Sequence, residues 1–108
     1  MKIKELLRQY RALDAEIKDI RERHLTEPEL SDILDEEMQN ITATRREIEV
    51  YIAGIPDSLV RCIIRYRYID CMTWGEIAAK LTTDGRGAYS GDSCRIIVER
   101  YMKKAPEA

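Results

Sequence analysis

The stretch "TWGEIAAKL" (residues 73–81) decides the fold, because it specifies the start of a helix that cannot stand alone. Thr73 and Glu76 have the spacing of a capping box, in which the hydroxyl accepts from the backbone N–H of Glu76 and the carboxylate accepts from that of Thr73. A helix this short is unstable in water by itself, and the turn-forming residues "TTDGRG" follow it directly. We therefore expect a short helix that packs against neighbouring helices.

The composition favours long, solvated helices over a large globular core. Of the 108 residues, 35% are charged, one is Trp and none is Phe. No apolar run approaches the roughly 18 residues of a membrane span, and the N-terminus lacks a signal-peptide core, so we expect a cytoplasmic protein without a membrane segment. The three cysteines, an odd number, fit a reducing compartment better than a set of disulfides.

The net charge of −2 hides two parts of opposite sign. Residues 1–54 hold 9 Lys and Arg against 13 Asp and Glu, a balance of −4. Residues 55–108 hold 9 against 7, a balance of +2. Gly54 and Pro56 interrupt the helical pattern at the border. We therefore expect one domain at 1–54 and another at 55–108, of which only the second favours an anionic partner.

The first part has the pattern of an antiparallel coiled-coil hairpin. Seam residues are spaced mostly 3 and 4 apart, as in a heptad repeat, on both sides of a break at Pro28. The first seam consists of Ile3, Leu6, Tyr10, Leu13, Ile17, Ile20 and His24. The second consists of Leu30, Leu34, Met38, Ile41, Arg45, Ile48, Ile52 and Ile55. A short polar loop between two such helices predicts that they lie side by side.

Two helices cannot cover all of these apolar residues. Ile33 lies beside Leu34, and Tyr51 lies beside Ile52, so both fall outside a single seam. Pairing two hairpins into a four-helix bundle would cover them, and we therefore expect a homodimer through the N-terminal hairpin. Alternatively, the hairpin folds back on the C-terminal part of its own chain.

No arrangement of residues indicates catalysis or a metal site. Cys62, Cys71 and Cys94 lack the paired spacing of zinc ligands, and His24 is the only histidine. The acidic residues "DEE" (35–37) diverge around a helix axis and do not converge on one ion. We expect neither an enzyme nor a bound metal or cofactor.

The second part has three short segments with helical spacing. The first spans 55–70, and the supporting helix at 73–81 follows it. Ser90, Asp92 and Ser93 are candidate N-caps of a last helix. The three apolar stripes are Leu59, Ile63, Tyr66 and Ile69; Trp74, Ile77, Ala78 and Leu81; and Cys94, Ile97, Val98 and Tyr101. None of these helices is stable alone, so we expect them to bury their stripes together in an all-α protein.

Two segments resemble the helix-turn-helix of sigma-factor region 4. They are "YRYIDCMTWGEIAAKL" (66–81) and "SGDSCRIIVERY" (90–101). More narrowly, residues 55–104 are similar to small phage and prophage transcriptional regulators of that type. The resemblance implies a three-helix domain that binds double-stranded DNA sequence-specifically, regulates phage genes and contacts RNA polymerase. No segment resembles the core-binding and promoter-melting regions of a complete sigma factor.

The chain departs from that family at two places. Cys71 occupies the turn position where the family usually has Gly, so it must accept the backbone of that turn. The connection "TTDGRGAYSGD" (82–92) is much longer than the usual three or four residues. It is either a wing-like extension that brings Arg86 to the phosphate backbone or a flexible surface loop.

The outward positions of the last helix are the candidate DNA contacts. Residues near the start of a recognition helix meet base edges, so Ser93 and Arg95 are the first candidates. Arg can read guanine bidentately, and Ser and Arg can also bind phosphate. Asp92 and Glu99 oppose binding by their charge unless they contact cytosine or orient an arginine. The full candidate set is Arg86, Ser90, Ser93, Arg95, Ile96, Glu99, Arg100 and Lys103.

Other functions fit the same pattern. A helix-turn-helix beside an oligomerising hairpin also suits the small, DNA-recognising subunit of a phage terminase. A protein-interaction module without DNA binding fits the small basic excess and the long connection, and the outward residues would then form an ordinary solvated face. We expect a transcriptional regulator and keep these two as alternatives.

Overall fold

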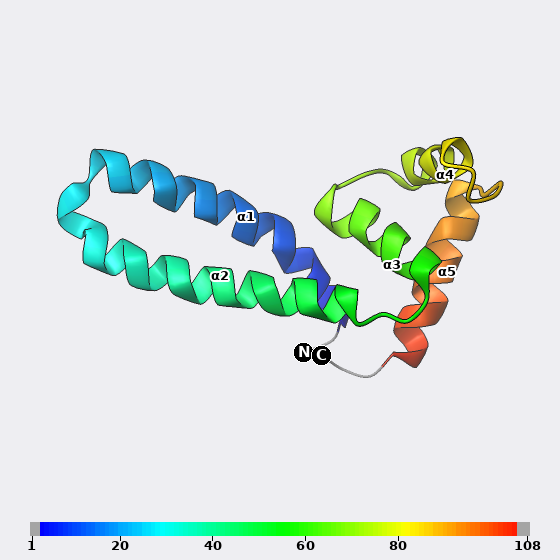
Figure 1. The fold of residues 1–108 in the computed structure, drawn as a ribbon, viewed down its shortest axis with the longest axis horizontal. Coiled ribbons are helices and arrows are strands. Elements are labelled where there is room, and N and C mark those ends of the chain that lie inside the picture. Colours follow the sequence, from blue (N-terminus) through cyan, green and yellow to red (C-terminus); the bar gives the residue numbers. More distant parts are fainter. Residues whose placement is uncertain (1–2, 106–108) are drawn as a thin grey trace.

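The computed structural model describes residues 3–105, and the regular elements in this part of the chain are all helical (Figure 1). The all-α class expected from the sequence is confirmed. Residues 1–2 and 106–108, the outer ends of the two predicted domains, lie outside the described residues. Within residues 3–105, no helix combines the length and the apolar character needed to cross a bilayer.

Two long helices, α1 (Ile3–Thr26) and α2 (Ser31–Ala53), run antiparallel (Figure 1). We call them the long pair. A 3-10 turn, η1 (Pro28–Leu30), joins them at the break expected from the sequence, because a proline cannot continue a helix but suits the first position of a new turn. At this tip, His24 Nε2 lies 3.1 Å from Asp35 Oδ1, so the single histidine connects the end of α1 to α2.

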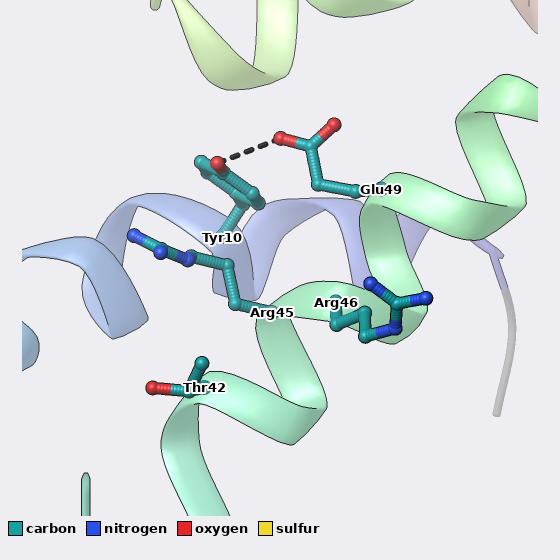
Figure 2. A pocket seen from close by; sticks show the side chains of 5 residues that line it. All are labelled: Tyr10, Thr42, Arg45, Arg46 and Glu49. Carbon is teal, nitrogen blue, oxygen red and sulfur yellow. Dashed lines mark hydrogen bonds between the residues drawn. The ribbon is translucent and has the colours of Figure 1, made fainter. Parts of the chain in front are cut away.

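A polar layer divides the interface of the long pair into two apolar clusters. The Tyr10 hydroxyl donates to Glu49 Oε1 at 2.8 Å, as Figure 2 shows, and Arg45 Nη1 donates to Asp14 Oδ1 at 3.1 Å. Tyr10 and Arg45 can therefore occupy seam positions, because each has a polar partner on the facing helix. A shift of one helix along the other would break both bonds, so the layer favours a single register. The cluster nearer the tip consists of Ile17, Ile20, Leu34 and Ile41.

The remaining elements form what we call the C-terminal group. It consists of α3 (Ser58–Ile64), η2 (Arg65–Ile69), α4 (Trp74–Thr83) and α5 (Gly91–Lys104). The Asp57 carboxylate starts α3 by accepting from the backbone N–H groups of Leu59 and Val60 at 2.8 and 3.2 Å. The end of α2 leads into this group directly, and the group packs beside the open end of the long pair (Figure 1).

The helix expected to start after Pro56 is present over residues 58–69, but its second half is the π-helical segment η2. The Asp70 N–H bonds to the carbonyl of Arg65, five residues back, at 3.0 Å. The wider turn accommodates one extra residue, and Tyr68 and Ile69 both pack half-buried on the core. Apolar residues spaced 3 or 4 apart carry no signal for such a turn, so the sequence did not indicate it.

One apolar core joins the base of the long pair to the C-terminal group. Its most deeply buried side chains come from every α-helix: Leu7, Ile48, Ile52, Ile55, Ile63, Ile64, Ile77, Leu81, Cys94 and Val98. The predicted stripes omit Leu7, Val60 and Ile64, because a stripe accounts for one facing helix whereas these side chains contribute to a core shared by several. The long pair therefore packs on the C-terminal group of its own chain, which is one of the two arrangements expected from the sequence.

Leu7→Ala should destabilise both ends of this core. We expect the free energy of unfolding to fall by about 2–5 kcal/mol, because Leu7 is fully buried. Trp74 fluorescence follows the C-terminal group, and far-ultraviolet circular dichroism is dominated by the long pair, so both urea transitions should shift together. Ile33→Ala, at a position 65% exposed, is the control and should shift neither by more than about 0.5 kcal/mol. An unmoved fluorescence transition would instead indicate two independent cores.

Tyr10 should make the protein less stable at high pH. Burial first, and then the hydrogen bond to Glu49, raise the pKa of Tyr10 from 10.0 to about 12. The folded state holds the proton more tightly than the unfolded chain does, so this stabilisation is complete below about pH 10 and is lost as the pH rises towards 12. The free-energy advantage of the wild type over Tyr10→Phe should therefore shrink across that range in urea titrations. A constant difference would contradict the raised pKa of Tyr10 in the folded state.

Candidate nucleic-acid interface

The capping box of α4 has the geometry expected from the sequence. The Thr73 N–H donates to Glu76 Oε1 at 2.9 Å, and the Glu76 N–H donates to Thr73 Oγ1 at 3.2 Å. The hydrogen bond from the Thr73 backbone holds the pKa of Glu76 below its ordinary value, so the capping carboxylate stays ionised at neutral pH. The apolar face of α4 buries Ile77, Ala78 and Leu81 in the shared core, where they hold this short helix in place.

The turn before α4 depends on two residues. Cys71 has a φ of +57°, in the left-handed region that favours glycine, so the backbone of this turn is the one that a Gly would adopt without strain. Arg67 Nη1 donates to the carbonyl of Met72 at 3.1 Å, which braces the turn. The same guanidinium lies 4.6 Å from the centre of the Trp74 ring. Trp74 is half-buried and packs against the core, as expected from the sequence.

The long connection brings α5 back to the beginning of α4. A Cβ on Gly91 would lie 3.2 Å from both the backbone N of Gly75 and the backbone C of Trp74, so α5 starts against the first turn of α4. The ten residues of α4 are about 15 Å long, and a turn of four residues reaches at most about 14 Å. Residues 84–90 have the length to make this return, which explains the departure from a short helix-turn-helix connection.

Arg86 is exposed, but its guanidinium bonds to α3 instead of standing free as a wing tip. Its Nη1 donates to Cys62 Sγ at 3.2 Å, and its Nη2 donates to Ser58 Oγ at 3.1 Å. Gly85 and Gly87, with φ of +73° and +119°, allow the chain to reverse on either side of it. Arg86 thus connects the loop between α4 and α5 to α3. The predicted contact of Arg86 with phosphate would require these two hydrogen bonds to break.

Ser90 and Ser93 form the cap of α5. Ser90 Oγ accepts from the Ser93 N–H at 3.1 Å, and Ser93 Oγ accepts from the Ser90 N–H at 2.9 Å. The Ser93 hydroxyl also donates to the Ser90 carbonyl at 2.9 Å. Ser90 is therefore the N-cap among the candidates. Both hydroxyls predicted to contact DNA therefore already take part in the hydrogen bonds of this cap.

The exposed face of α5 lies opposite its buried residues Cys94 and Val98. Arg95 Nη1 lies 3.0 Å from Glu99 Oε2, and about two-fifths of the Arg95 side chain is exposed. The structure places six of the eight candidate residues on this helix: Ser93, which takes part in its cap, and the five exposed or half-buried residues Arg95, Ile96, Glu99, Arg100 and Lys103. We call these five the α5 face. Sequence reasoning missed Gly91, whose only signal is a glycine directly after the N-cap, where it allows α5 to approach α4 closely.

Within residues 3–105, no three His, Cys, Asp or Glu side chains gather as a metal site requires. Cys94 is buried, and burial raises the pKa of its thiol, so the thiol stays protonated. Comparison with known protein families, curated proteins and solved structures finds no match to this chain. The function of the α5 face is therefore argued from its own geometry and charge.

Gly75→Ala and Gly91→Ala should change stability in opposite directions. A Cβ at Gly75 would meet no atom within 4 Å, so the alanine should raise the free energy of unfolding by about 0.5–1 kcal/mol through its helix propensity. A Cβ at Gly91 would press on the backbone of α4, and we expect a loss of about 1–3 kcal/mol. Urea denaturation measures both. Equal stabilisation by the two alanines would contradict the close approach of α5 to α4.

Proposed function

We propose that the chain binds double-stranded DNA sequence-specifically and regulates transcription, with α4 and α5 acting as a helix-turn-helix and the long pair as a coiled-coil hairpin. The single observation that carries the proposal is the α5 face. The core fixes one side of α5, and the opposite side presents three basic side chains, Arg95, Arg100 and Lys103. An α-helix fits the major groove, where side chains reach base edges.

Arg95 is the candidate for reading a base. It lies in the N-terminal half of α5, the part of a recognition helix that meets base edges. Its guanidinium can donate two hydrogen bonds to one guanine. The ion pair with Glu99 is exposed and therefore weak, so Arg95 can exchange this partner for a base at little cost. Glu99 then either accepts from a cytosine or continues to orient Arg95.

Arg100 and Lys103 are the candidates for phosphate contacts. Both are exposed near the C-terminal end of α5, and neither forms an ion pair within residues 3–105. Phosphate contacts set the position and the orientation of a protein on a duplex without reading its sequence. The small basic excess of residues 55–108 predicts weak non-specific binding, so base contacts must supply much of the discrimination.

The tip of the long pair favours protein binding as a second candidate function. Leu25, in the last turn of α1, is 86% exposed, and Ile33, in the first turn of α2, is 65% exposed. These two turns form the tip, which lies remote from the C-terminal group (Figure 1). Apolar side chains that are exposed together in one patch are typical of surfaces that contact another protein. RNA polymerase and a second copy of the chain are the two partners that a DNA-binding regulator would use, and the homodimer stays a prediction. Two copies could read two half-sites.

The proposed function is tested by selecting bound sequences from random duplex DNA and measuring affinity for the best site. Arg95→Ala should cost about 1–3 kcal/mol on that site and relax the preference at one base pair. Lys103→Ala should weaken binding to all sequences alike and lower the salt slope by about one. The two variants thus separate reading of a base from contact with phosphate.

Two further variants control for charge. Arg95→Lys keeps the positive charge but loses the bidentate geometry, so it should retain the salt slope while losing the base preference. Arg46→Ala removes an exposed charge from α2 and should leave both unchanged. If wild-type protein enriches no sequence and binds duplex DNA no better than the Lys103→Ala variant does, DNA binding by α5 is excluded.

A further inference from the structure

A cleft of about 310 Å³ lies between the base of α1 and the turn that precedes α4. Its lining comes from two segments that are far apart in the sequence but packed together in the fold. The lining residues are Leu7, Arg8, Arg11, Arg67, Tyr68 and Cys71. We call it the arginine cleft, because half of its lining side chains carry a guanidinium group.

The arginine cleft keeps its positive charge within the described part of the chain. Among residues 3–105, none of its arginines forms an ion pair with a carboxylate, whereas Lys18 and Arg23 on the same helix each pair with an acidic residue one turn away. Arg8 and Arg11 are three residues apart on one helix, where like charges repel and destabilise the helix slightly. A cleft that collects positive charge at such a cost is suited to an anion.

Arg67 is held in a fixed position within the cleft. Its hydrogen bond to the Met72 carbonyl and its stacking on Trp74 leave its remaining N–H groups available. Tyr68 adds a phenol, and burial raises its pKa, so the phenol stays protonated and able to donate at neutral pH. Guanidinium groups that converge with a hydroxyl match the oxygen atoms of a phosphate.

The arginine cleft and the α5 face are linked through α4, because η2, which supplies Arg67 and Tyr68 to the cleft, packs on α4, and α4 packs on α5. The Glu99 carboxylate acts on Tyr68 electrostatically, as do the guanidinium groups of Arg8 and Arg67. Glu99 is also the ion-pair partner of Arg95, at 3.0 Å. The charged groups of the cleft and of the α5 face therefore influence a common side chain, even though they come from opposite ends of the sequence.

We propose that the arginine cleft binds a phosphate group, and that this phosphate belongs to the backbone of the duplex that the α5 face contacts. The assignment to DNA rests on the proposed function, whereas the preference for a phosphate rests on the cleft alone. Arg8 and Arg11 supply exposed guanidinium groups, and Arg67 supplies one that Met72 and Trp74 hold in place. The long pair thereby takes part in DNA binding directly, in addition to supporting the C-terminal group.

The test compares the full-length wild type with the double variant Arg8→Gln/Arg11→Gln in duplex binding across a KCl series. Each lost phosphate contact lowers the salt slope by about 0.9, so the double variant should lower it by about 1.8. Arg21→Gln/Arg46→Gln makes the same change in charge at exposed positions outside the cleft and should leave the slope unchanged. Urea denaturation, followed by Trp74 fluorescence, should show that both double variants fold as the wild type does.

A second measurement uses inorganic pyrophosphate as the probe. Arg67 lines the cleft and stacks on Trp74, the only tryptophan, so an anion bound there should change Trp74 fluorescence saturably. We expect this change in the wild type and in the control, and its loss in Arg8→Gln/Arg11→Gln. Equal salt slopes for the wild type and this double variant overturn the DNA assignment while leaving the α5 proposal intact.

The two proposals can fail separately. If the wild type binds no duplex, the proposed function fails and the DNA assignment fails with it. A pyrophosphate signal that requires Arg8 and Arg11 then identifies a site for a free phosphate compound. The absence of any pyrophosphate signal, together with equal salt slopes, overturns the arginine cleft as a phosphate site.

Discussion

The structure depends on the burial of short helices against the base of two long ones. α3 has seven residues and α4 has ten, lengths at which a helix in water gains too few hydrogen bonds to offset its nucleation. Leu7 and Ile52 of the long pair meet Ile63 and Ile77 of the C-terminal group in one core and supply the missing stabilisation. At residue 54 the charge balance and the direction of the chain change, but the apolar core continues from one side to the other.

Much of the fold could be predicted, because it is specified by local chemistry. The capping box of Thr73 and Glu76 and the break at Pro28 depend on neighbours within four residues, and both are where the sequence indicates. Features that depend on a third element could not be predicted. A heptad seam between two helices does not include Leu7, because Leu7 packs in a core shared by several elements. The π-helical turn of η2 leaves the spacing of the apolar residues unchanged, so the sequence gives no sign of it.

The candidate site divides in the same way. Periodicity predicts which residues of α5 face away from Cys94 and Val98, because a helix repeats every 3.6 residues. It does not predict that Arg86 turns back to Ser58 and Cys62, since that contact joins residues at least 24 apart in the sequence. The arginine cleft could not be predicted either, because Arg8 and Arg67 meet only after α1 packs on η2.

The net charge of −4 over residues 1–54 does not describe how charge is distributed along the surface of the long pair. About half of its acidic residues lie towards the tip, among them Glu27, Glu29, Asp32 and the run at 35–37, whereas Arg8 and Arg11 near the base have no ion-pair partner within residues 3–105. A charge acts over roughly 10 Å at moderate ionic strength, whereas the molecule is 54 Å long. The acidic tip therefore does little to offset the positive charge of Arg8 and Arg11 at the base of the long pair.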